Sequence, residues 1–143
     1  MITDIQLADD LRDFYLRSHR VVDRVMKAEG VSLARCKLLS FIRRTQSARS
    51  ADVAAMFGYS PRTVTEAIDS LERDGLVTRM PDSNDRRAKI IVITPEGEAA
   101  LAASEPARDR FLKAVFGTLE QEERERLSAI LGKMNLCLER LEG

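Results

Sequence analysis

Two short helical patterns separated by a tight turn constrain the fold of this chain more than any other feature. The first pattern covers residues 50–57 and ends before Gly58, and the second begins at Ser60 and Pro61. Serine is a favoured N-cap, and proline suits the first helical position because no N–H is needed there. The second pattern carries one apolar stripe, formed by Val64, Ile68 and Leu71. A helix with this period buries one face and leaves the other free, so residues 50–71 predict a helix-turn-helix.

A β-hairpin is predicted directly after these helices. Gly75 stands where the helical periodicity ends, and glycine readily adopts the left-handed conformation that closes a helix. Short β-branched and apolar runs follow at residues 76–80 and 89–94, and a charged, turn-rich segment at 81–87 joins them. The predicted fold class is therefore mainly α with a small β-hairpin wing, a winged helix-turn-helix. This geometry places one helix in the DNA major groove while the wing reaches a neighbouring groove.

Three segments of the chain resemble the MarR family of bacterial transcription regulators in their order and spacing. They are TVT at 63–65 with IDSLERDGLV at 68–77, DSNDRR at 82–87, and ITPEG at 93–97. Two residues depart from the family pattern: Ser83 stands where proline is frequent, and Glu66 where arginine is frequent. An acid at position 66 repels phosphate and can only accept a hydrogen bond, for example from cytosine N4.

The resemblance implies a single domain over residues 1–143 with two functional parts. Residues 31–94 would form the winged helix-turn-helix DNA-binding region, and residues 1–30 and 95–143 the dimerisation helices that interlock two chains. The wide apolar arc of residues 5–28 fits a second subunit, although a helix buried within a monomer is an alternative. Two identical recognition helices on a homodimer match a pseudo-palindromic DNA site with half-sites about 10 base pairs apart.

Positive charge is unevenly distributed along the chain, although the net charge is zero. Residues 35–49 contain five basic residues and no acidic one, and the predicted wing carries Arg86, Arg87 and Lys89. These two clusters bracket the helix that the family places in the groove, so we expect both to contact DNA phosphates. The alternative is that they are ordinary solvated surface charges.

The start of the second helix is the best candidate for direct DNA contact. Ser60, Arg62 and Thr63 lie at its N-terminus, where hydroxyls, backbone N–H groups and the positive end of the helix dipole suit phosphate. Arg62, Thr65 and Glu66 are placed to contact base edges. An arginine bound to guanine would be the strongest single specific contact, worth about 1–3 kcal/mol against a wrong base.

The predicted wing supplies the second candidate contact. Arg86 or Arg87 is expected to enter the minor groove, where a narrow A·T-rich track concentrates negative potential. We expect Asp85 to orient one of these arginines through a salt bridge and to leave the other free. Spacing alone does not assign the two roles.

Three residues outside the helix-turn-helix are candidates for an effector pocket. Tyr15 and His19 lie on one stripe of the first helix, and Cys36 on the second helix could face the same space. The family keeps an effector pocket between its dimerisation and DNA-binding parts. The alternative is a hydrogen-bonded core histidine and an inert buried thiol, and a lone histidine does not indicate a metal.

Several other classes of protein are not expected from this sequence. No apolar run approaches the length of a membrane span, and residues 1–4 lack a signal-peptide pattern, so a cytoplasmic location is predicted. Cys36 and Cys137 are too few and too far apart for a disulfide framework or a zinc cluster, and no cofactor or metal is predicted. An enzyme is not expected, because the chain shows no nucleophile with a base and no phosphate-binding glycine loop.

The predicted function is therefore a sequence-specific transcriptional regulator that binds double-stranded DNA as a homodimer, acting as a repressor that a small-molecule effector releases. The alternative function is a winged-helix module for protein-protein interaction. Its binding would lack the steep salt dependence that phosphate neutralisation produces.

Overall fold

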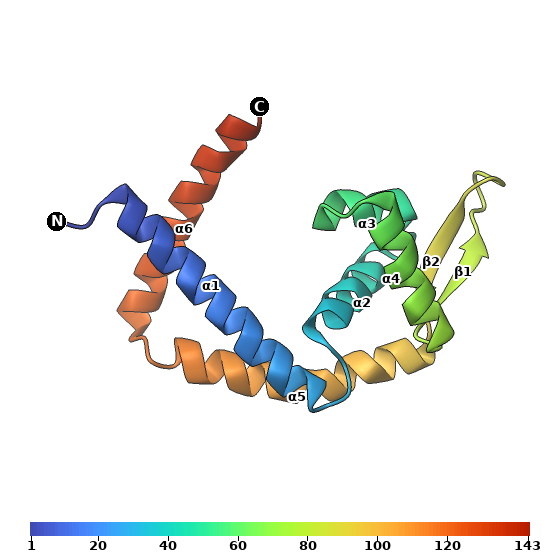
Figure 1. Cartoon of the computed structure of the whole chain (residues 1–143), viewed down its shortest axis with the longest axis horizontal. Helices are drawn as coiled ribbons and strands as arrows, with labels where there is room; N and C mark the ends of the chain where they lie inside the picture. The colour runs from blue at the N-terminus through green and yellow to red at the C-terminus, as the bar shows by residue number, and fades with distance from the viewer. The chain divides into compact units, whose positions relative to one another are not determined.

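The computed structural model describes residues 1–143 as six helices and one antiparallel hairpin (Figure 1). In chain order the elements are α1 (Asp4–Lys27), α2 (Leu33–Thr45), α3 (Ser50–Phe57), α4 (Pro61–Arg73), β1 (Val77–Pro81), β2 (Lys89–Ile93), α5 (Pro95–Phe116) and α6 (Gln121–Glu142). The predicted fold class is thus confirmed. The chain forms two compact units, residues 1–108 and residues 109–143, and α5 contributes to both. None of the helices combines the length and the apolar character needed to span a membrane.

The predicted helix boundaries of the helix-turn-helix are confirmed by hydrogen bonds at the caps. Ser60 Oγ accepts the Thr63 N–H at 3.1 Å, and Pro61 occupies the first turn of α4. Gly75 adopts a φ of +77°, which lets the chain leave α4 while the Leu76 N–H donates to the Leu71 carbonyl at 2.9 Å. Glycine takes this left-handed conformation without a steric penalty.

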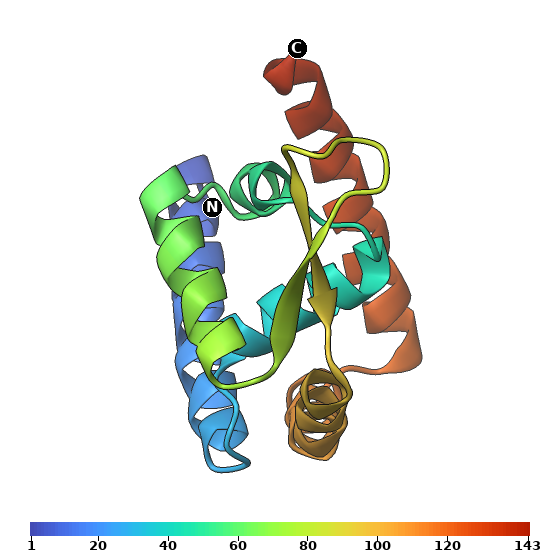
Figure 2. The ribbon, with the colours of Figure 1, turned by 90° about the vertical axis from the view of Figure 1, so that its right-hand side faces the viewer.

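The core of the first unit lies between the helix-turn-helix and the hairpin. α3 and β1 each pack against α4, and β2 packs against α2. Figure 2 shows the hairpin beside α4, with α2 behind it. The side chains at the centre of this core are 0–2% exposed, and they include Leu39, Ile42, Val53, Val64, Ile68, Leu71, Val77 and Ile91. The predicted apolar stripe of α4 is therefore its buried face.

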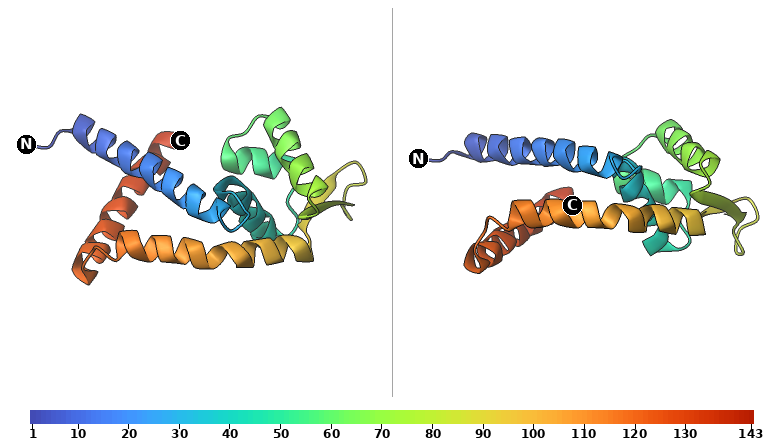
Figure 3. Two further views of the ribbon diagram at one scale, coloured as in Figure 1. Left: turned by 60° about the horizontal axis from the view of Figure 1, so that its bottom comes forward. Right: turned by 90° about the horizontal axis from the view of Figure 1, so that it is seen from below.

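The hairpin is held to the helices by a short third segment. β1 and β2 pair from Val77 with Ile93 to Pro81 with Lys89. Ala48, just before α3, forms a bridge with Ile91, whose N–H donates to the Ala48 carbonyl at 2.7 Å. In both views of Figure 3 the hairpin loop lies at the opposite end of this unit from the N-terminus.

A close backbone contact joins the start of α5 to the end of α4. The Thr94 hydroxyl donates to the Gly75 carbonyl at 2.6 Å and accepts the Gly97 N–H at 3.0 Å. A Cβ atom on residue 97 would lie 2.2 Å from the Leu76 carbonyl oxygen. Only glycine, which has no Cβ, avoids this clash. Beyond this joint, α5 continues unbroken through Pro106.

Large apolar side chains remain exposed on both units. On α1 they are Ile5, Leu7, Leu11, Phe14, Tyr15 and Leu16, each 45–76% exposed. This exposure contradicts deep burial of the first helix within a monomer. In the second unit no residue of α6 is buried, and its exposed apolar residues include Leu127, Ile130, Leu131, Met134, Leu138 and Leu141. Surfaces of this kind mark sites of association.

Candidate nucleic-acid interface

The N-terminal end of α4 is open to solvent and carries several hydrogen-bonding groups. Ser60, Arg62 and Thr63 are all exposed, as the sequence pattern predicts. Ser60 Oγ lies 3.0 Å from Thr63 Oγ1, so the two hydroxyls form one polar cluster beside the first backbone N–H groups of the helix. Such an end attracts anions through its free N–H groups and its dipole.

The exposed face of α4 carries one ion pair. Arg62 Nε donates to Glu66 Oε1 at 3.1 Å, and the side chains are 89% and 65% exposed. Thr65 Oγ1 donates to the Pro61 carbonyl at 3.0 Å, so its hydroxyl proton is used within the helix. Thr65 can therefore only accept a hydrogen bond from an external partner without breaking this contact.

The acidic residues further along α4 are neutralised by arginines from outside the helix. Arg79 on β1 contacts Asp69 at 2.7 Å and Glu72 at 2.8 Å. Arg35 on α2 contacts Asp74, just beyond the helix end, at 2.6 Å. Both arginines hold α4 against the rest of the unit. The pattern of the strand could have identified Arg79, because it shares the inward face of β1 with buried Val77.

The cations of the basic stretch 35–49 are partly exposed, and most of them have a partner within the same unit. Three of its arginines are paired with carboxylates of the same unit: Arg35 with Asp74, Arg43 with Glu98 and Arg49 with Asp82. Lys37 contacts His19, and the Arg44 guanidinium lies 5.8 Å from the centre of the Phe41 ring. Several of these charges thus join elements of the fold through partners distant in sequence, whereas Arg43 and Arg44 stay exposed, and contact of this stretch with DNA phosphates stays a prediction.

The base of the wing is fixed by Asp82. Its carboxylate accepts the Asn84 N–H at 2.9 Å and pairs with the Arg49 guanidinium, which donates through Nη2. The backbone hydrogen bond, followed by the arginine contact, lowers the pKa of Asp82 below its ordinary value. The sequence pattern predicts no role for Asp82, and it predicts Arg49 only as one of the phosphate-contacting cations. An aspartate often accepts a hydrogen bond from the backbone N–H two residues ahead, so Asp82 in this turn-rich segment is a local signal for its contact with Asn84.

The tip of the wing exposes its cations. Arg86, Arg87 and Lys89 are all exposed. Asp85 Oδ1 accepts the backbone N–H of Arg87 at 3.0 Å and forms no ion pair with either wing arginine. The predicted salt bridge is thus replaced by a turn hydrogen bond, because the short aspartate side chain reaches the N–H two residues ahead. Both guanidinium groups remain available to an external partner.

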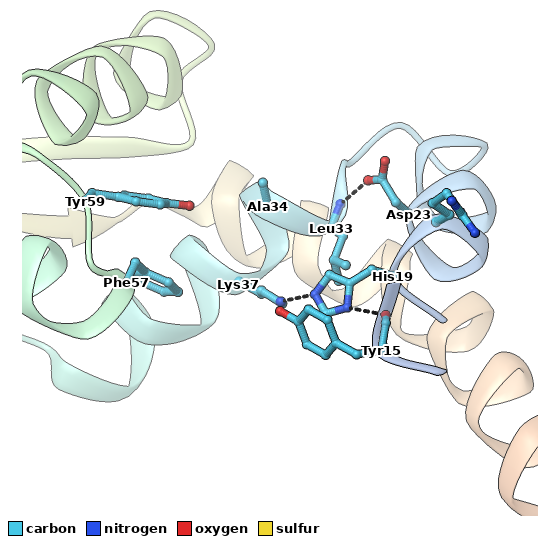
Figure 4. Close-up of a pocket in the computed structure, with 9 residues that line it drawn as sticks. Tyr15, His19, Asp23, Leu33, Ala34, Lys37, Phe57 and Tyr59 are labelled. Atoms are coloured by element: carbon cyan, nitrogen blue, oxygen red, sulfur yellow. Dashed lines mark hydrogen bonds between the residues drawn. The ribbon is translucent and has the colours of Figure 1, made fainter. Parts of the chain in front are cut away.

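A cavity of about 540 Å³ lies between α1, α2 and the end of α3 (Figure 4). Its lining residues are Tyr15, His19, Arg20, Asp23, Leu33, Ala34, Lys37, Phe57 and Tyr59. The Lys37 ammonium donates to His19 Nε2 at 2.7 Å, and His19 Nδ1 lies 3.3 Å from the Tyr15 carbonyl. An ammonium can only donate, so His19 Nε2 is the acceptor in this contact.

The three predicted pocket residues do not all meet in this cavity. Tyr15 and His19 line it, with ring centres 4.1 Å apart. Cys36 is buried on another side of α2, where its Sγ donates to Ser104 Oγ of α5 at 3.4 Å. Burial raises the pKa of this thiol. The placement of Cys36 in the same space is wrong, because the residue lies one helical position from Lys37 and points to a different face.

These observations define a class of protein. An exposed, dipole-positive end of α4 and a cationic hairpin tip on the same unit make a winged helix-turn-helix of the DNA-binding type. The sequence model described as the MarR family matches residues 31–89. The transcriptional regulator YwhA of Bacillus subtilis is 28% identical over 131 residues, which cover 92% of this chain and 94% of YwhA. Residues 31–89 therefore contain a MarR-family region, and the similarity to a transcriptional regulator extends over nearly the whole chain.

Solved structures of the family have the same fold. A crystal structure of Staphylococcus aureus MepR in complex with DNA matches with a TM-score of 0.79 and 22% identity, over 96% of this chain and 99% of MepR. A structure of Bordetella bronchiseptica BpsR, whose DNA binding is regulated by 6-hydroxynicotinic acid, matches with a TM-score of 0.78 and 24% identity. That match covers 94% of this chain and 96% of BpsR.

Proposed function

We propose that this protein binds pseudo-palindromic double-stranded DNA as a homodimer and represses transcription until a small ligand releases it. The observation that carries the proposal is the pairing pattern of the charges. Arg35, Arg49 and Arg79 are each paired with a carboxylate inside the unit, whereas Arg86 and Arg87 on the wing, like Arg73 at the end of α4, have no carboxylate partner. The S. aureus MepR complex supports DNA as the partner that they meet.

Each exposed residue then has a distinct contact to make. Ser60 and Thr63 suit phosphate at the N-terminus of α4, and Arg62 suits a guanine edge in the major groove. Lys89 suits a phosphate beside the wing, while one of the wing arginines enters the minor groove. Thr65 presents an acceptor to the bases, and Glu66 pairs with Arg62 beside it.

Homodimer formation would cover the exposed apolar residues of α1 and α6. A helix such as α6, with no buried residue of its own and a stripe of leucines, gains stability only by packing against another surface. Two copies of the chain would present two recognition helices, which fits a DNA site with half-sites about 10 base pairs apart.

Ligand release is proposed to act through the cavity beside His19. A ligand with an apolar body could pack against Phe57 and Tyr59, with its polar group near Arg20 and Lys37. If that ligand prefers a dimer whose recognition helices are wrongly spaced, it lowers DNA affinity by the ratio of its affinities for the two states. BpsR, a structural relative regulated by a small aromatic acid, supports this kind of control.

A titration with the DNA beside the protein's own gene tests the proposal. The full-length protein is titrated against labelled intergenic duplex at about 50 mM and about 200 mM salt, with a scrambled duplex as control. We expect preferred binding to one site and a steep loss of affinity at the higher salt. Equal binding to both duplexes, or binding that salt does not weaken, would contradict the proposal and favour a protein partner instead. Sedimentation of the free protein tests the dimer separately.

A further inference from the structure

Glu66 differs from the other acidic residues at the exposed end of the helix-turn-helix. Asp69, Glu72 and Asp74 are each neutralised by an arginine from α2 or β1. Glu66 instead pairs with Arg62, one turn earlier on the same exposed face of α4. We propose that Glu66 is a specificity-determining residue that positions the Arg62 guanidinium for guanine. This inference rests on the proposed function.

The geometry of the pair leaves the correct atoms of Arg62 free. Glu66 Oε1 accepts from Nε at 3.1 Å, on the side of the guanidinium, so the two parallel N–H groups at its end, one on each terminal nitrogen, remain free to donate. Guanine presents O6 and N7 side by side in the major groove, and an arginine binds both with two parallel hydrogen bonds. A guanidinium held by Nε can meet this edge only with its terminal nitrogens, which fixes one orientation.

The pair also lowers the entropic cost of that contact. Arg62 is 89% exposed, and no residue other than Glu66 restrains its side chain. Immobilising one flexible side chain at an interface costs about 0.5–1.5 kcal/mol, which corresponds to about two- to tenfold in affinity. Glu66 restrains the Arg62 side chain before DNA binds, so part of this entropic cost is removed. Glu66 therefore raises affinity only for sites with a guanine that Arg62 can bind in this fixed geometry.

The negative charge of Glu66 adds discrimination against other DNA. A carboxylate on the exposed face of α4 repels phosphates and offsets the positive charge of Arg62 at every sequence. Only a site with guanine at the correct position compensates for this repulsion. Glu66 thereby weakens non-specific binding, which is dominated by phosphate attraction.

Two substitutions separate these effects. Glu66→Gln keeps an acceptor at the same distance but removes the charge, whereas Glu66→Asp keeps the charge but withdraws the carboxylate by one methylene from its present position at Nε. The matched control is Glu122→Gln, because Glu122 forms an equally exposed pair with Arg126 four residues later, on α6. Sites are first selected from a random duplex library with the wild-type protein. Affinities are then measured for the selected site, for its variants at each guanine, and for random duplex.

We expect one guanine per half-site whose discrimination falls about two- to tenfold in Glu66→Asp and is largely kept in Glu66→Gln. Glu66→Gln should bind random duplex more tightly, and Glu122→Gln should match the wild type in every measurement. In the Arg62→Ala background, Glu66→Asp should no longer affect that guanine.

Other outcomes overturn the inference. Discrimination unchanged in Glu66→Asp would show that the carboxylate does not position Arg62. An effect that persists in Arg62→Ala would show that Glu66 contacts a base by itself, for example cytosine N4. If the wild-type protein selects no sequence at all, the proposed function fails as well, so the two failures are distinguishable.

Discussion

Replacing Arg79 should weaken the attachment of α4 to the wing. Its side chain is only 24% exposed and forks between two carboxylates, with Nη2 at 2.7 Å from Asp69 and Nη1 at 2.8 Å from Glu72. Arg79→Met keeps most of the length and apolar contact of the side chain but removes both ion pairs. It also leaves two carboxylates three residues apart on α4 without a cation between them.

The expected loss follows from the exposure of the partners. Asp69 and Glu72 are 54% and 42% exposed, so solvent screens each pair, and such pairs contribute about 0.2–1 kcal/mol each. Repulsion between like charges one turn apart adds about 0.2–0.5 kcal/mol. We expect Arg79→Met to lower the free energy of unfolding by about 1–2 kcal/mol. For a chain of this size that corresponds to a fall in Tm of about 2–8 °C.

Thermal unfolding followed by circular dichroism checks this value, with all proteins at one concentration because association raises Tm. The matched control is Arg126→Met, which removes a single pair whose partners are 73% and 82% exposed and should change Tm by about 1 °C or less. Equal shifts for the two variants would refute the reasoning that the Arg79 fork stabilises the unit. Arg79→Lys, with one charge and no fork, should fall between Arg79→Met and the wild type.

Three further predictions concern the wing and the buried thiol. Arg87→Ala should lower DNA affinity at all sites rather than at one base. The slope of log K against log salt should become shallower by about 1.8, because a dimer loses two phosphate contacts of about 0.9 each. An unchanged slope would show that the wing does not touch DNA. Because the folded-state pKa of Asp82 is lowered, its stabilising contribution is present at neutral pH and is lost as the pH falls through that pKa. Urea unfolding should therefore show Asp82→Asn less stable than the wild type at pH 7, with the difference shrinking below about pH 4; a constant difference would contradict the assignment. Cys36 is buried with a raised pKa, so in a Cys137→Ala background a thiol reagent should label it only after denaturant is added. Fast labelling of the folded protein would contradict its burial.

Local patterns in the sequence were sufficient to predict the backbone of the DNA-binding region. Ser60, Pro61 and Gly75 act through hydrogen bonds and dihedral angles within four residues, so their effects follow from the immediate sequence. The apolar spacing of α4 likewise indicates its buried face before any partner is known. The order of helices and hairpin followed from these signals together.

The partners of the charged residues could not be predicted in the same way. Arg35 and Arg49 meet carboxylates 39 and 33 residues away, and nothing in their own neighbourhood indicates which ones. The acid-free basic stretch indicates contact with DNA, but it does not indicate that Arg35, Arg43 and Arg49 also pair with carboxylates of α5, of the wing and of the residue after α4. Cys36 illustrates the same limit, since its contact with Ser104 spans 68 residues and depends on how α5 packs.

The absence of a side chain at position 97 determines how α5 can be altered. A Cβ there would meet the Leu76 carbonyl at 2.2 Å and Ile93 Cγ1 at 2.7 Å, so backbone lies directly on backbone. Thr94 links to Gly75 across the same contact, and no flexible side chain separates the two segments. A protein engineer who grafts a differently angled α5 onto this unit would therefore tilt α4 along with it. Regulators with altered operator spacing are best designed by changing α5 beyond Ala107, the last of its buried residues.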